Sequence, residues 1–525
     1  MGIYVNPGNA SFQNDVNSQI YVDKTGIIEL LNQMVNTAQK FVCVSRARRF
    51  GKSVTAGMIE AYYSKGCSSK ELFQGYEIAT KKSFLTYLNQ YDTIHIDMGE
   101  VWSDCGKKED RFISFLTETI LTELKEEYAT VEISECETIA MALAKINNQL
   151  GVTFVIVMDE WDTVFREAKQ NKKLQNDYVS LLRALFKSES AKRFVALAYI
   201  TGILPIKKYG VESALNNFDE YTMLSPKIFA RYFGFTGEEV QALCQQYDMD
   251  FDKMKEWYDG YSFKNAPHIY NPNSVVKAIR FDSFESYWSS TEAFSSLTGY
   301  ISLNFEGLRD DIIRMFSGAR CRVKVGNFEN DFVSYKSKDD VMTALIHLGY
   351  LAYDLENRQA YIPNKEVQEA FEYAIEGAKW SEVVNAVEAS EQLLRSTWQK
   401  DEDAVAKAME KVHEEAASVL QYNDENSLSC AISLAFYNAK EYYTIMREAP
   451  FGKGYADLEF VPRKHKDVPA MILELKCDQT AEDAIAQIKE RRYMDGMQEY
   501  KGNMLLVGIQ YDKKTKEHHC KIEEW

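Results

Sequence analysis

The chain of 525 residues is too long for one compact core and suggests about three domains of roughly 150 residues each. Hydrophobic residues at 46% and charged residues at 26% are ordinary for a globular protein and exclude a disordered chain. The net charge of -17 excludes a protein whose whole surface coats nucleic acid, although it leaves room for a local basic groove.

The apolar segments and the cysteines bear on where the protein works. The longest apolar runs, such as FVIVM at 154–158, are the length of strands, whereas a membrane span needs about 18 apolar residues. The first residues lack a basic region followed by an apolar stretch, so we expect no secretory signal. The nine cysteines form no C-x-x-C pair, which is typical of a reducing compartment. We therefore expect a cytoplasmic protein that does not enter a membrane.

The segment SRARRFGKS at 45–53 ends like a phosphate-binding loop, G-x-x-x-x-G-K-S/T, but has Arg46 where the first glycine stands. The run KFVCVS at 40–45 predicts a strand before it, and SVTAGMIEAYYSK at 53–65 predicts a helix after it. Strand, loop and helix is the order that such a loop requires. The alternative is a basic turn on the surface.

In a loop of this kind the backbone amides and the helix N-terminus face the phosphates of a nucleotide. Lys52 then reaches the β and γ oxygens, the Ser53 hydroxyl ligates magnesium, and a Cβ at Gly51 would obstruct the backbone near the phosphate. With Arg46 in place of the glycine, the start of the loop has less conformational freedom. Whether the positive charge of Arg46 faces the phosphates cannot be read from the sequence. The predicted ATP-binding residues are Arg46, Arg48, Arg49, Phe50, Gly51, Lys52, Ser53, Val54, Asp159 and Thr201.

Three further strands are predicted along the first two hundred residues, at 94–99, 153–162 and 193–202. The second, TFVIVMDEWD, is a continuous apolar run that ends in Asp159 and Glu160, as a Walker B strand does. Asp159 is predicted to hold magnesium and Glu160 to polarise the attacking water, with Asp162 the next candidate for that role. Thr201 ends the third strand, at the place of a γ-phosphate sensor. Alternating strands and helices predict a doubly wound parallel sheet.

The middle of the chain reads as mainly helical. FTGEEVQALCQQY at 235–247 begins a helix with a capping box, and we expect a helical lid on the nucleotide-binding core. Residues 339–375 read helix, strand, turn, strand, helix, which fits a winged-helix-like connector or a helical spacer with a hairpin. No arginine finger can be assigned. The expected domains are 1–204, a P-loop AAA-like ATPase core; 205–285, the lid; 286–400, the connector; and 401–525, a C-terminal domain.

The C-terminal hundred residues hold a second group of chemically suitable side chains. Two strand-like runs, at 452–461 and 469–478, are separated by a polar turn and predict a hairpin. Glu474 and Lys476 project from one face of the second strand, and Asp457 on the first can be aimed at the same place. Asp457 and Glu474 are predicted to bind magnesium and Lys476 to position water for phosphodiester cleavage. A helix at 479–497 then leads to a strand parallel to the second.

Taken together, the motifs resemble the bacterial AAA-ATPase-like family that carries a PD-(D/E)XK nuclease-like domain at its C-terminus. The resemblance runs in order along nearly the whole chain. Its motifs are YVDKTGIIELL at 21–31, SRARRFGKS, VMDEWD at 157–162, ITGILPI at 200–206, SALNNFDEY at 213–221, FGFTGEEV at 233–240, WYDGYSF at 257–263 and YNPNSV at 270–275.

The resemblance implies a P-loop NTPase of the α/β class and a C-terminal restriction-endonuclease-like fold, with ATP and magnesium as cofactors. The family's loop typically reads R-P-R-R-F-G-K-S, so Arg46 is its normal variant and Ala47 replaces a proline. The resemblance also implies supporting roles in the nuclease site, carried by Glu448, Gln487 and Tyr493. One departure is Tyr455, where the family often has an arginine, which puts a contact to substrate phosphate in doubt.

The resulting hypothesis is an ATPase whose nucleotide state governs a magnesium-dependent nuclease acting on DNA or RNA. The rival is a nucleotide-driven switch whose nuclease-like domain binds a partner and cuts nothing. The presence of Asp457, Glu474 and Lys476 favours the nuclease. The sequence leaves the nucleic-acid substrate, the oligomeric state and the biological trigger open.

Overall fold

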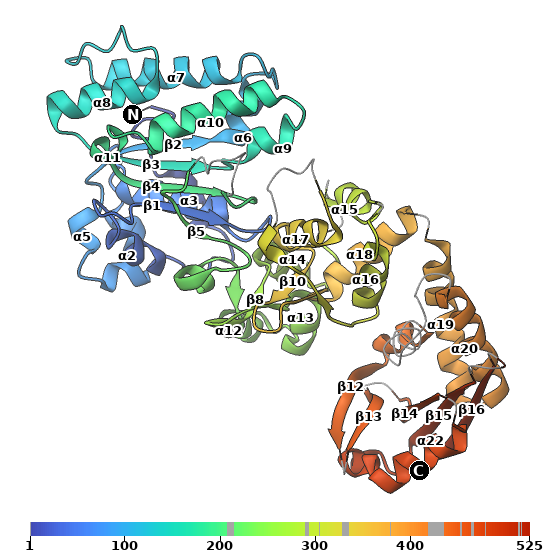
Figure 1. The fold of residues 1–525 in the computed structure, drawn as a ribbon. Coiled ribbons are helices and arrows are strands. Elements are labelled where there is room, and N and C mark those ends of the chain that lie inside the picture. The colour runs from blue at the N-terminus through green and yellow to red at the C-terminus, as the bar shows by residue number, and fades with distance from the viewer. Residues whose placement is uncertain are drawn as a thin grey trace. The chain divides into compact units, whose positions relative to one another are not determined.

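A computed structural model describes residues 2–525 apart from 207–214, 289–292, 304, 328–334, 379, 418–434, 452–453, 464–466, 478, 513–514 and 516. The chain divides into two compact units (Figure 1). Unit 1 comprises Met1–Ser290 and Arg322–Glu369, and unit 2 comprises Thr291–Cys321 and Ala370–Trp525. Residues 322–369 therefore belong to the same unit as the first two hundred residues.

Unit 1 is built on a five-stranded sheet in the order β2-β3-β4-β1-β5, and its strands are parallel throughout. The predicted parallel sheet is thereby confirmed. Every residue of β1, β3 and β4 is buried, as expected for central strands that are covered on both faces. The strands are β1 (Phe41–Ser45), β2 (Asp92–Asp97), β3 (Phe154–Asp159), β4 (Val195–Gly202) and β5 (Asp219–Tyr221).

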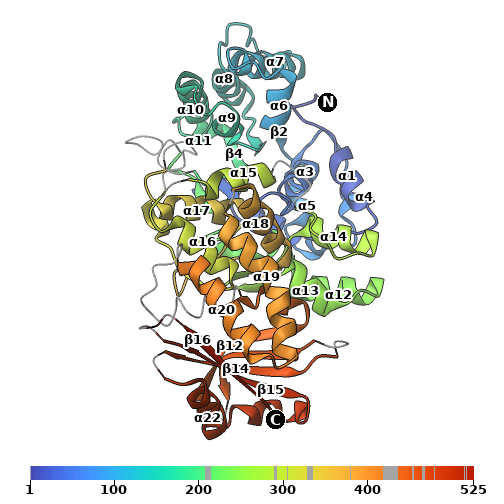
Figure 2. The ribbon, with the colours of Figure 1, turned by 90° about the vertical axis from the view of Figure 1, so that its right-hand side faces the viewer.

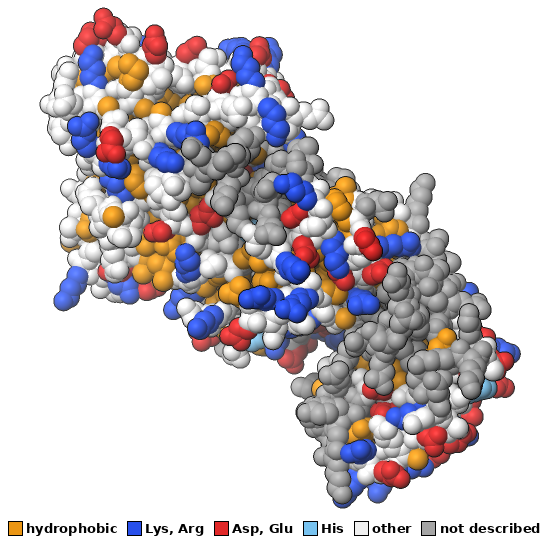
Figure 3. All heavy atoms as spheres, viewed as in Figure 1, with side chains coloured by type: hydrophobic (Ala, Val, Ile, Leu, Met, Phe, Trp, Pro, Cys, Tyr) orange, Lys and Arg blue, Asp and Glu red, His pale blue; other side chains and the backbone are white. Residues whose placement is uncertain are grey.

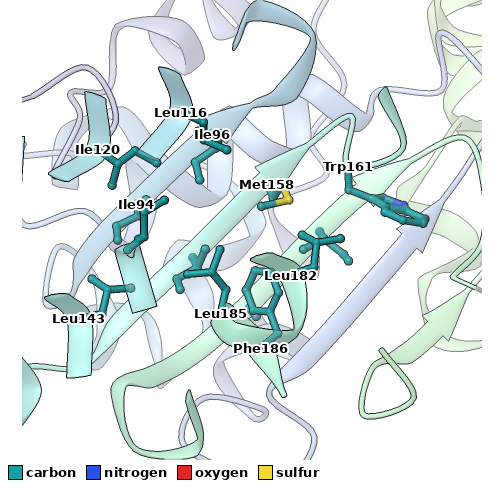
Figure 4. Close-up of a cluster of buried hydrophobic side chains, with 14 of the residues drawn as sticks. Ile94, Ile96, Leu116, Ile120, Leu143, Met158, Trp161, Leu182, Leu185 and Phe186 are labelled. Carbon is teal, nitrogen blue, oxygen red and sulfur yellow. The ribbon is translucent and has the colours of Figure 1, made fainter. Parts of the chain in front are cut away.

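Helices cover both faces of this sheet, so the predicted double winding is also confirmed. One face packs against α6 (Met98–Asp104), α7 (Phe112–Glu127), α8 (Ile139–Leu150) and α10 (Lys172–Phe186). Figure 4 shows Ile94 and Met158 of the sheet among Leu143 and Leu182 of these helices. The other face packs against α2 (Gly26–Asn32) and α3 (Lys52–Tyr63). Alternate residues of each strand serve the two cores, because side chains in a strand alternate between faces.

The region predicted as a helical lid, called the lid region below, contains a small sheet besides its helices. The capping box predicted at the start of α12 (Gly237–Tyr247) is present, because the Thr236 and Glu239 side chains bond each other's backbone amides. Behind it follow α13 (Phe251–Tyr258) and α14 (Pro272–Phe281). The region also contains a three-stranded sheet in the order β6-β8-β7. Strand β6 is Phe235–Thr236, β8 is Ala266–Tyr270 and β7 is Tyr261–Phe263.

The sequence order predicted for residues 339–375 is confirmed as α17 (Lys338–Leu348), β10 (Ala352–Asp354), β11 (Gln359–Tyr361) and α18 (Lys365–Gly377). The two strands pair in antiparallel fashion. α18 is one continuous helix that begins in unit 1 and ends in unit 2.

Unit 2 contains a mixed sheet in the order β12-β13-β14-β15-β16. The predicted hairpin is the antiparallel pair β13 and β14, and the predicted crossover places β15 parallel to β14 through α22 (Ala481–Arg491). In Figure 2, α22 lies on one side of the sheet, and α19 (Ser381–Trp398) and α20 (Glu402–Ala417) lie on the other. The strands are Tyr443–Phe451, Gly454–Pro462, Ala470–Cys477, Met504–Tyr511 and His518–Glu524.

The surface charges and the helix compositions are those of a globular chain. On the face drawn in Figure 3, basic and acidic side chains are interspersed over unit 1. Among the helices of the described residues, none has the length and apolar composition needed to cross a bilayer.

Gly260 shows why the WYDGYSF motif needs a glycine at the turn between α13 and β7. Its φ of +117° suits glycine, and an added Cβ would lie 2.0 Å from the Pro363 carbonyl oxygen. The same turn is held by Tyr361, whose hydroxyl donates to the Gly260 carbonyl at 3.0 Å, and by Asn364, whose side chain donates to the Asp259 carbonyl at 2.7 Å.

We therefore expect Gly260→Ala to lower the stability of unit 1 by about 2–4 kcal/mol, since backbone strain and a clash with main chain add together. Gly151→Ala is the matched control, because Gly151 has a φ of +70° but no atom within 4 Å of an added Cβ. The control should cost only about 1–2 kcal/mol. Scanning calorimetry measures both, and equal losses would contradict the role of the Pro363 contact.

Candidate functional site

The loop between β1 and α3 has the backbone of a phosphate-binding loop. Gly51 precedes the first residue of α3 with a φ of +84°, a left-handed conformation that favours glycine. A Cβ at Gly51 would meet no protein atom within 4 Å, so the backbone conformation accounts for the glycine within the protein itself. Lys52 is buried, and its Nζ donates to the Ala47 carbonyl at 2.9 Å. Burial lowers the pKa of Lys52 to about 8, against the opposing charges of Asp159, Asp162 and Glu160.

Asp159 lies beside this loop, at the carboxyl end of β3. Its side chain is buried, and burial raises its pKa, while a hydrogen bond with Ser53 and the charge of Lys52 oppose the rise. On the neighbouring strand β2, Asp97 stands opposite Asp159 in the register. The structure thus brings Lys52, Ser53 and Asp159 together, and the hydroxyl and carboxylate oxygens among them are ligands that suit magnesium.

Glu160 follows directly in a left-handed conformation, with a φ of +51°. Its carboxylate is half-exposed and accepts a hydrogen bond from Arg166 Nη2 at 2.7 Å, within α9 (Thr163–Glu167). Arg166 Nη2 also donates to the Thr163 hydroxyl at 3.2 Å. This ion pair was not predicted from the sequence. The sequence signal for it is an arginine six residues after Glu160, on the following helix.

Asp162 and Thr201 are both engaged by the backbone. The Asp162 carboxylate is buried and accepts from the amides of Ile203 and Leu204, at 3.1 and 2.9 Å, so it holds the chain that leaves β4. The Thr201 hydroxyl donates to the Val44 carbonyl of β1 at 2.9 Å. In this conformation, therefore, the hydroxyl of Thr201 ties two strands together, and its role as a γ-phosphate sensor stays a prediction.

Arg46 is turned into the interior of unit 1. Its Nη1 donates to the carbonyls of Ser45 and Tyr221, at 2.9 and 3.0 Å, and the guanidinium lies 5.3 Å from the ring centre of Phe233 and 6.0 Å from that of Phe263. The whole side chain is buried, which lowers its pKa to about 9. Arg46 thus connects the start of the loop to the lid region. Its contact with a nucleotide stays a prediction.

The other predicted loop residues divide between surface and interior. Arg48 and Val54 are exposed. Arg49 donates from Nη1 to the Tyr287 carbonyl at 2.6 Å. Phe50 is buried and packs edge-on against Tyr261, with ring centres 5.2 Å apart.

The WYDGYSF motif, whose role the sequence did not reveal, packs against the loop. Tyr261 contacts Phe50 and donates its hydroxyl to the Gly349 carbonyl at 2.6 Å. Phe263 lies under Arg46, as described above. A Cβ at Gly349 would lie 2.6 Å from the Cβ of Ala47, so this glycine allows the chain after α17 to approach the loop closely. The motif therefore supports the phosphate-binding loop from the lid side.

In unit 2 the predicted nuclease residues also converge. Asp457 on β13 accepts from the Leu475 amide of β14 at 2.8 Å. Glu474 Oε1 accepts from Lys476 Nζ at 3.3 Å and from Gln487 Nε2. Lys476 Nζ also donates to Gln487 Oε1 at 2.5 Å, and Gln487 Nε2 lies 3.5 Å from the Tyr493 hydroxyl. Helix α22 and the segment after it thus hold the lysine and one glutamate oxygen in place.

The second oxygen of Glu474 fits a cation. Oε2 is buried and has no hydrogen-bond partner among the described residues. Burial raises the pKa of Glu474 to about 7, with the charge of Asp457 adding to the rise and that of Lys476 opposing it. A divalent cation between Asp457 and Glu474 would satisfy this oxygen and relieve the repulsion.

Glu448 stands across from Asp457 by backbone register, because β12 and β13 pair Arg447 with Leu458 and Ala449 with Ala456. Its side chain lies outside the described residues. In the described part of the chain, no three His, Cys, Asp or Glu side chains are grouped so as to hold a metal. The candidate ligand pair in the described structure is therefore Asp457 and Glu474.

A third carboxylate on this face was missed. Glu459 lies two residues beyond Asp457 on β13 and pairs opposite Ile472, whose side chain packs with α22. Glu459 is 0% exposed, and neither carboxylate oxygen has a partner among the described residues. Burial raises its pKa to about 7. The only sequence signal was an acid at an inward position of a strand.

Comparisons with known protein families agree with this geometry. Residues 8–212 match the family model AAA-ATPase_like, described as a predicted AAA-ATPase, and residues 423–523 match a model of the PD-(D/E)XK nuclease superfamily. The chain carries an AAA-ATPase-like region and a PD-(D/E)XK nuclease superfamily domain. The resemblance inferred from the motifs is thereby confirmed. The AAA-ATPase-like region contains Lys52, Ser53 and Asp159, and the nuclease superfamily domain contains Asp457 and Glu474.

One curated relative of this chain is the "Uncharacterized protein in vnfD 5'region" of Azotobacter chroococcum mcd 1, 23% identical over 279 residues. The match covers 52% of this chain and 50% of that protein, so the chain spans about half of its relative's length.

Three solved structures show weaker likeness. They are a replication initiator DnaA bound to AMPPCP and single-stranded DNA (7% identity, 64% of this chain and 80% of that chain, TM-score 0.24), the ORC2 protein of Aeropyrum pernix in ADPNP and ADP complexes (9%, 70% and 96%, 0.28) and CDC6P from Pyrobaculum aerophilum (12%, 72% and 99%, 0.23). TM-scores this low establish no shared ligand or activity.

Glu459 leads to a testable pH dependence of the nuclease superfamily domain. Because its folded pKa of about 7 lies above the unfolded value, Glu459 favours the folded domain fully below pH 4.5, and this contribution is lost as the pH rises through 7. Glu459→Gln removes the titration. We expect the variant to be more stable than the parent by about 1–3 kcal/mol at pH 8, and to show no such gain at pH 4.5.

Calorimetry of the full chain in chelator measures the transition of unit 2 at both pH values. Glu482→Gln, at an exposed position in the first turn of α22, is the matched control and should show no such pH-dependent gain. A gain for Glu459→Gln that is the same at pH 4.5 and pH 8 would contradict the assignment.

Proposed function

We propose that this protein binds and hydrolyses ATP with magnesium at the loop before α3, and that its nucleotide state governs a metal-dependent nuclease activity on DNA or RNA in unit 2. The observation that carries the first part is the convergence of Lys52, Ser53 and Asp159 at the carboxyl edge of the parallel sheet. Both family matches support the proposal.

At the nucleotide site, the residues of the chain bind the phosphates and orient water. The amides at the start of α3 and the charge of Lys52 attract the phosphates. Lys52 exchanges its hydrogen bond with the Ala47 carbonyl for phosphate oxygens. Ser53 and Asp159 would hold magnesium, which when bound neutralises charge on the phosphates. Glu160 orients the attacking water once its carboxylate is released from Arg166, because an oxygen paired with a guanidinium is a poor acceptor for a water proton.

At the site in unit 2, Asp457 and Glu474 would hold the divalent ion, which when bound polarises a phosphodiester and lowers the pKa of bound water. Gln487 holds Lys476 so that its ammonium group points toward the Glu474 carboxylate. Tyr493 lies behind Gln487 and fixes the amide. These contacts position a lysine and two carboxylates on one face of the hairpin, which is the arrangement that such cleavage requires.

A second candidate function, partner binding without cleavage, is favoured by one observation. Tyr455 replaces an arginine that the resembled family often uses near substrate phosphate. A domain that lacks this contact but keeps its acidic pair can still bind a cation and a partner.

The nucleotide site is tested by separating binding from hydrolysis. Lys52→Ala should abolish ATP binding, since it removes the mobile charge at the β and γ phosphates, whereas Lys70→Ala, an exposed lysine on the next helix, should bind normally. Glu160→Gln should retain ATP and hydrolyse it about 100-fold more slowly or worse. Fluorescence binding and phosphate release measure the two steps. Parental affinity in a folded Lys52→Ala variant would remove the assignment of the loop.

The site in unit 2 is tested with single- and double-stranded DNA and RNA, with and without ATP and with magnesium or manganese. Asp457→Asn should lose cleavage together with any stabilisation of unit 2 by the metal. Lys476→Ala should lose cleavage but keep the metal-dependent stabilisation, because an ammonium group is no metal ligand. If the parent cuts no substrate yet is still stabilised by the metal, the partner-binding function is the correct one.

A further inference from the structure

The backbone of one residue near the nucleotide loop, Tyr287, is hydrogen-bonded by two side chains of opposite charge. The Tyr287 carbonyl accepts from Arg49 Nη1 at 2.6 Å, and the Tyr287 amide donates to Glu366 Oε1 at 2.9 Å. Glu366 also accepts from the Ser274 hydroxyl of α14 at 2.8 Å. The two bonds of Glu366 are buried and shielded from competition with water, whereas the bond from Arg49 is partly buried.

Both Tyr287 and Glu366 lie next to points at which the chain leaves unit 1. The first segment of unit 1 ends at Ser290, three residues after Tyr287, and the second ends at Glu369, three residues after Glu366. Glu366 is in the first turn of α18, which continues without a break into unit 2. The contact chain from Arg49 therefore ends on two of the segments through which the units are joined.

Arg49 belongs to the same loop as Lys52 and has a left-handed backbone with a φ of +69°. A phosphate group at the loop would attract its guanidinium in competition with the Tyr287 carbonyl. If Arg49 turns to the phosphate, the Tyr287 carbonyl loses this charged donor, and losing such a hydrogen bond costs about 1.5–3 kcal/mol unless the segment adjusts. The Glu366 side chain accepts from the amide of the same residue, so a shift of the Tyr287 backbone would change its hydrogen bond as well.

We propose that the contact chain Arg49, Tyr287 backbone and Glu366 transmits the nucleotide state of the loop to the two segments that lead into unit 2. The inference rests on the nucleotide binding proposed above. Glu366 is then a positioning residue, which acts through the Tyr287 backbone and Arg49 and touches no nucleotide.

Hydrogen exchange on the full chain, with and without a saturating non-hydrolysable ATP analogue, tests this path. In the parent protein the analogue should change the exchange of amides in α18. Glu366→Ala removes the acceptor of the Tyr287 amide, so this variant should bind the analogue within about threefold of the parent affinity and lose the change in α18. Ser274→Ala is the matched control, because it removes a different hydrogen bond of Glu366 and leaves the path intact.

A second variant changes the other end of the path, at Arg49, and tests the path even if Glu366→Ala folds poorly. Arg49→Gln, measured at saturating analogue, should also lose the change in α18, whereas Lys70→Gln, at an exposed position outside the loop, should keep it. A change in α18 that persists in either Glu366→Ala or Arg49→Gln overturns the path. An unchanged α18 in parent protein that binds the analogue overturns the path alone, whereas a parent protein that binds no analogue overturns the proposed function and the path with it.

Discussion

The parallel pairing of β3, β4 and β1 is the constraint on which the nucleotide site depends. Parallel strands end at a common edge, so the loop after β1, Asp159 at the end of β3 and Thr201 near the end of β4 must meet there. The helices on both faces bury the strands and leave this edge for chemistry. Lys52 is consequently placed in a buried setting beside carboxylates, where its charge is worth more than it would be in water.

Support from the lid explains how a loop without its first glycine can be built. Arg46 is anchored by the carbonyls of Ser45 and Tyr221 and by two aromatic rings, so the start of the loop is determined by packing. Phe50 fixes the other end against Tyr261. A glycine at the first position would allow the loop more backbone conformations, whereas the Arg46 side chain attaches the loop to Phe233 and Phe263 of the lid region. Any movement of Phe233, Tyr261 or Phe263 would therefore act on the loop between β1 and α3.

Unit 2 concentrates buried carboxylates on one face of a sheet. Glu474 has one oxygen held by Lys476 and Gln487 and one without a partner among the described residues, and Glu459 nearby has two such oxygens. Burying a carboxylate without compensation is costly, so arrangements of this kind are typical of sites where stability is given up for function. At Glu474, a bound divalent cation would supply the compensation that the described protein groups do not. Glu459 has no such explanation in the contacts around it.

The amino-acid sequence by itself determined the order and type of the main elements, because continuous apolar runs and helical periodicity are local signals. From the P-loop, Walker B and E-x-K spacings it also predicted side chains that the structure brings together, Lys52 with Asp159 and Glu474 with Lys476, while their chemical roles stay predictions. The pairing of Glu160 with Arg166, the inward turn of Arg46 and the bridge from Arg49 to Glu366 were decided only by the tertiary structure. Such contacts join side chains to groups that are distant in the chain or turned by the backbone, and the direction of a long side chain depends on everything that packs around it.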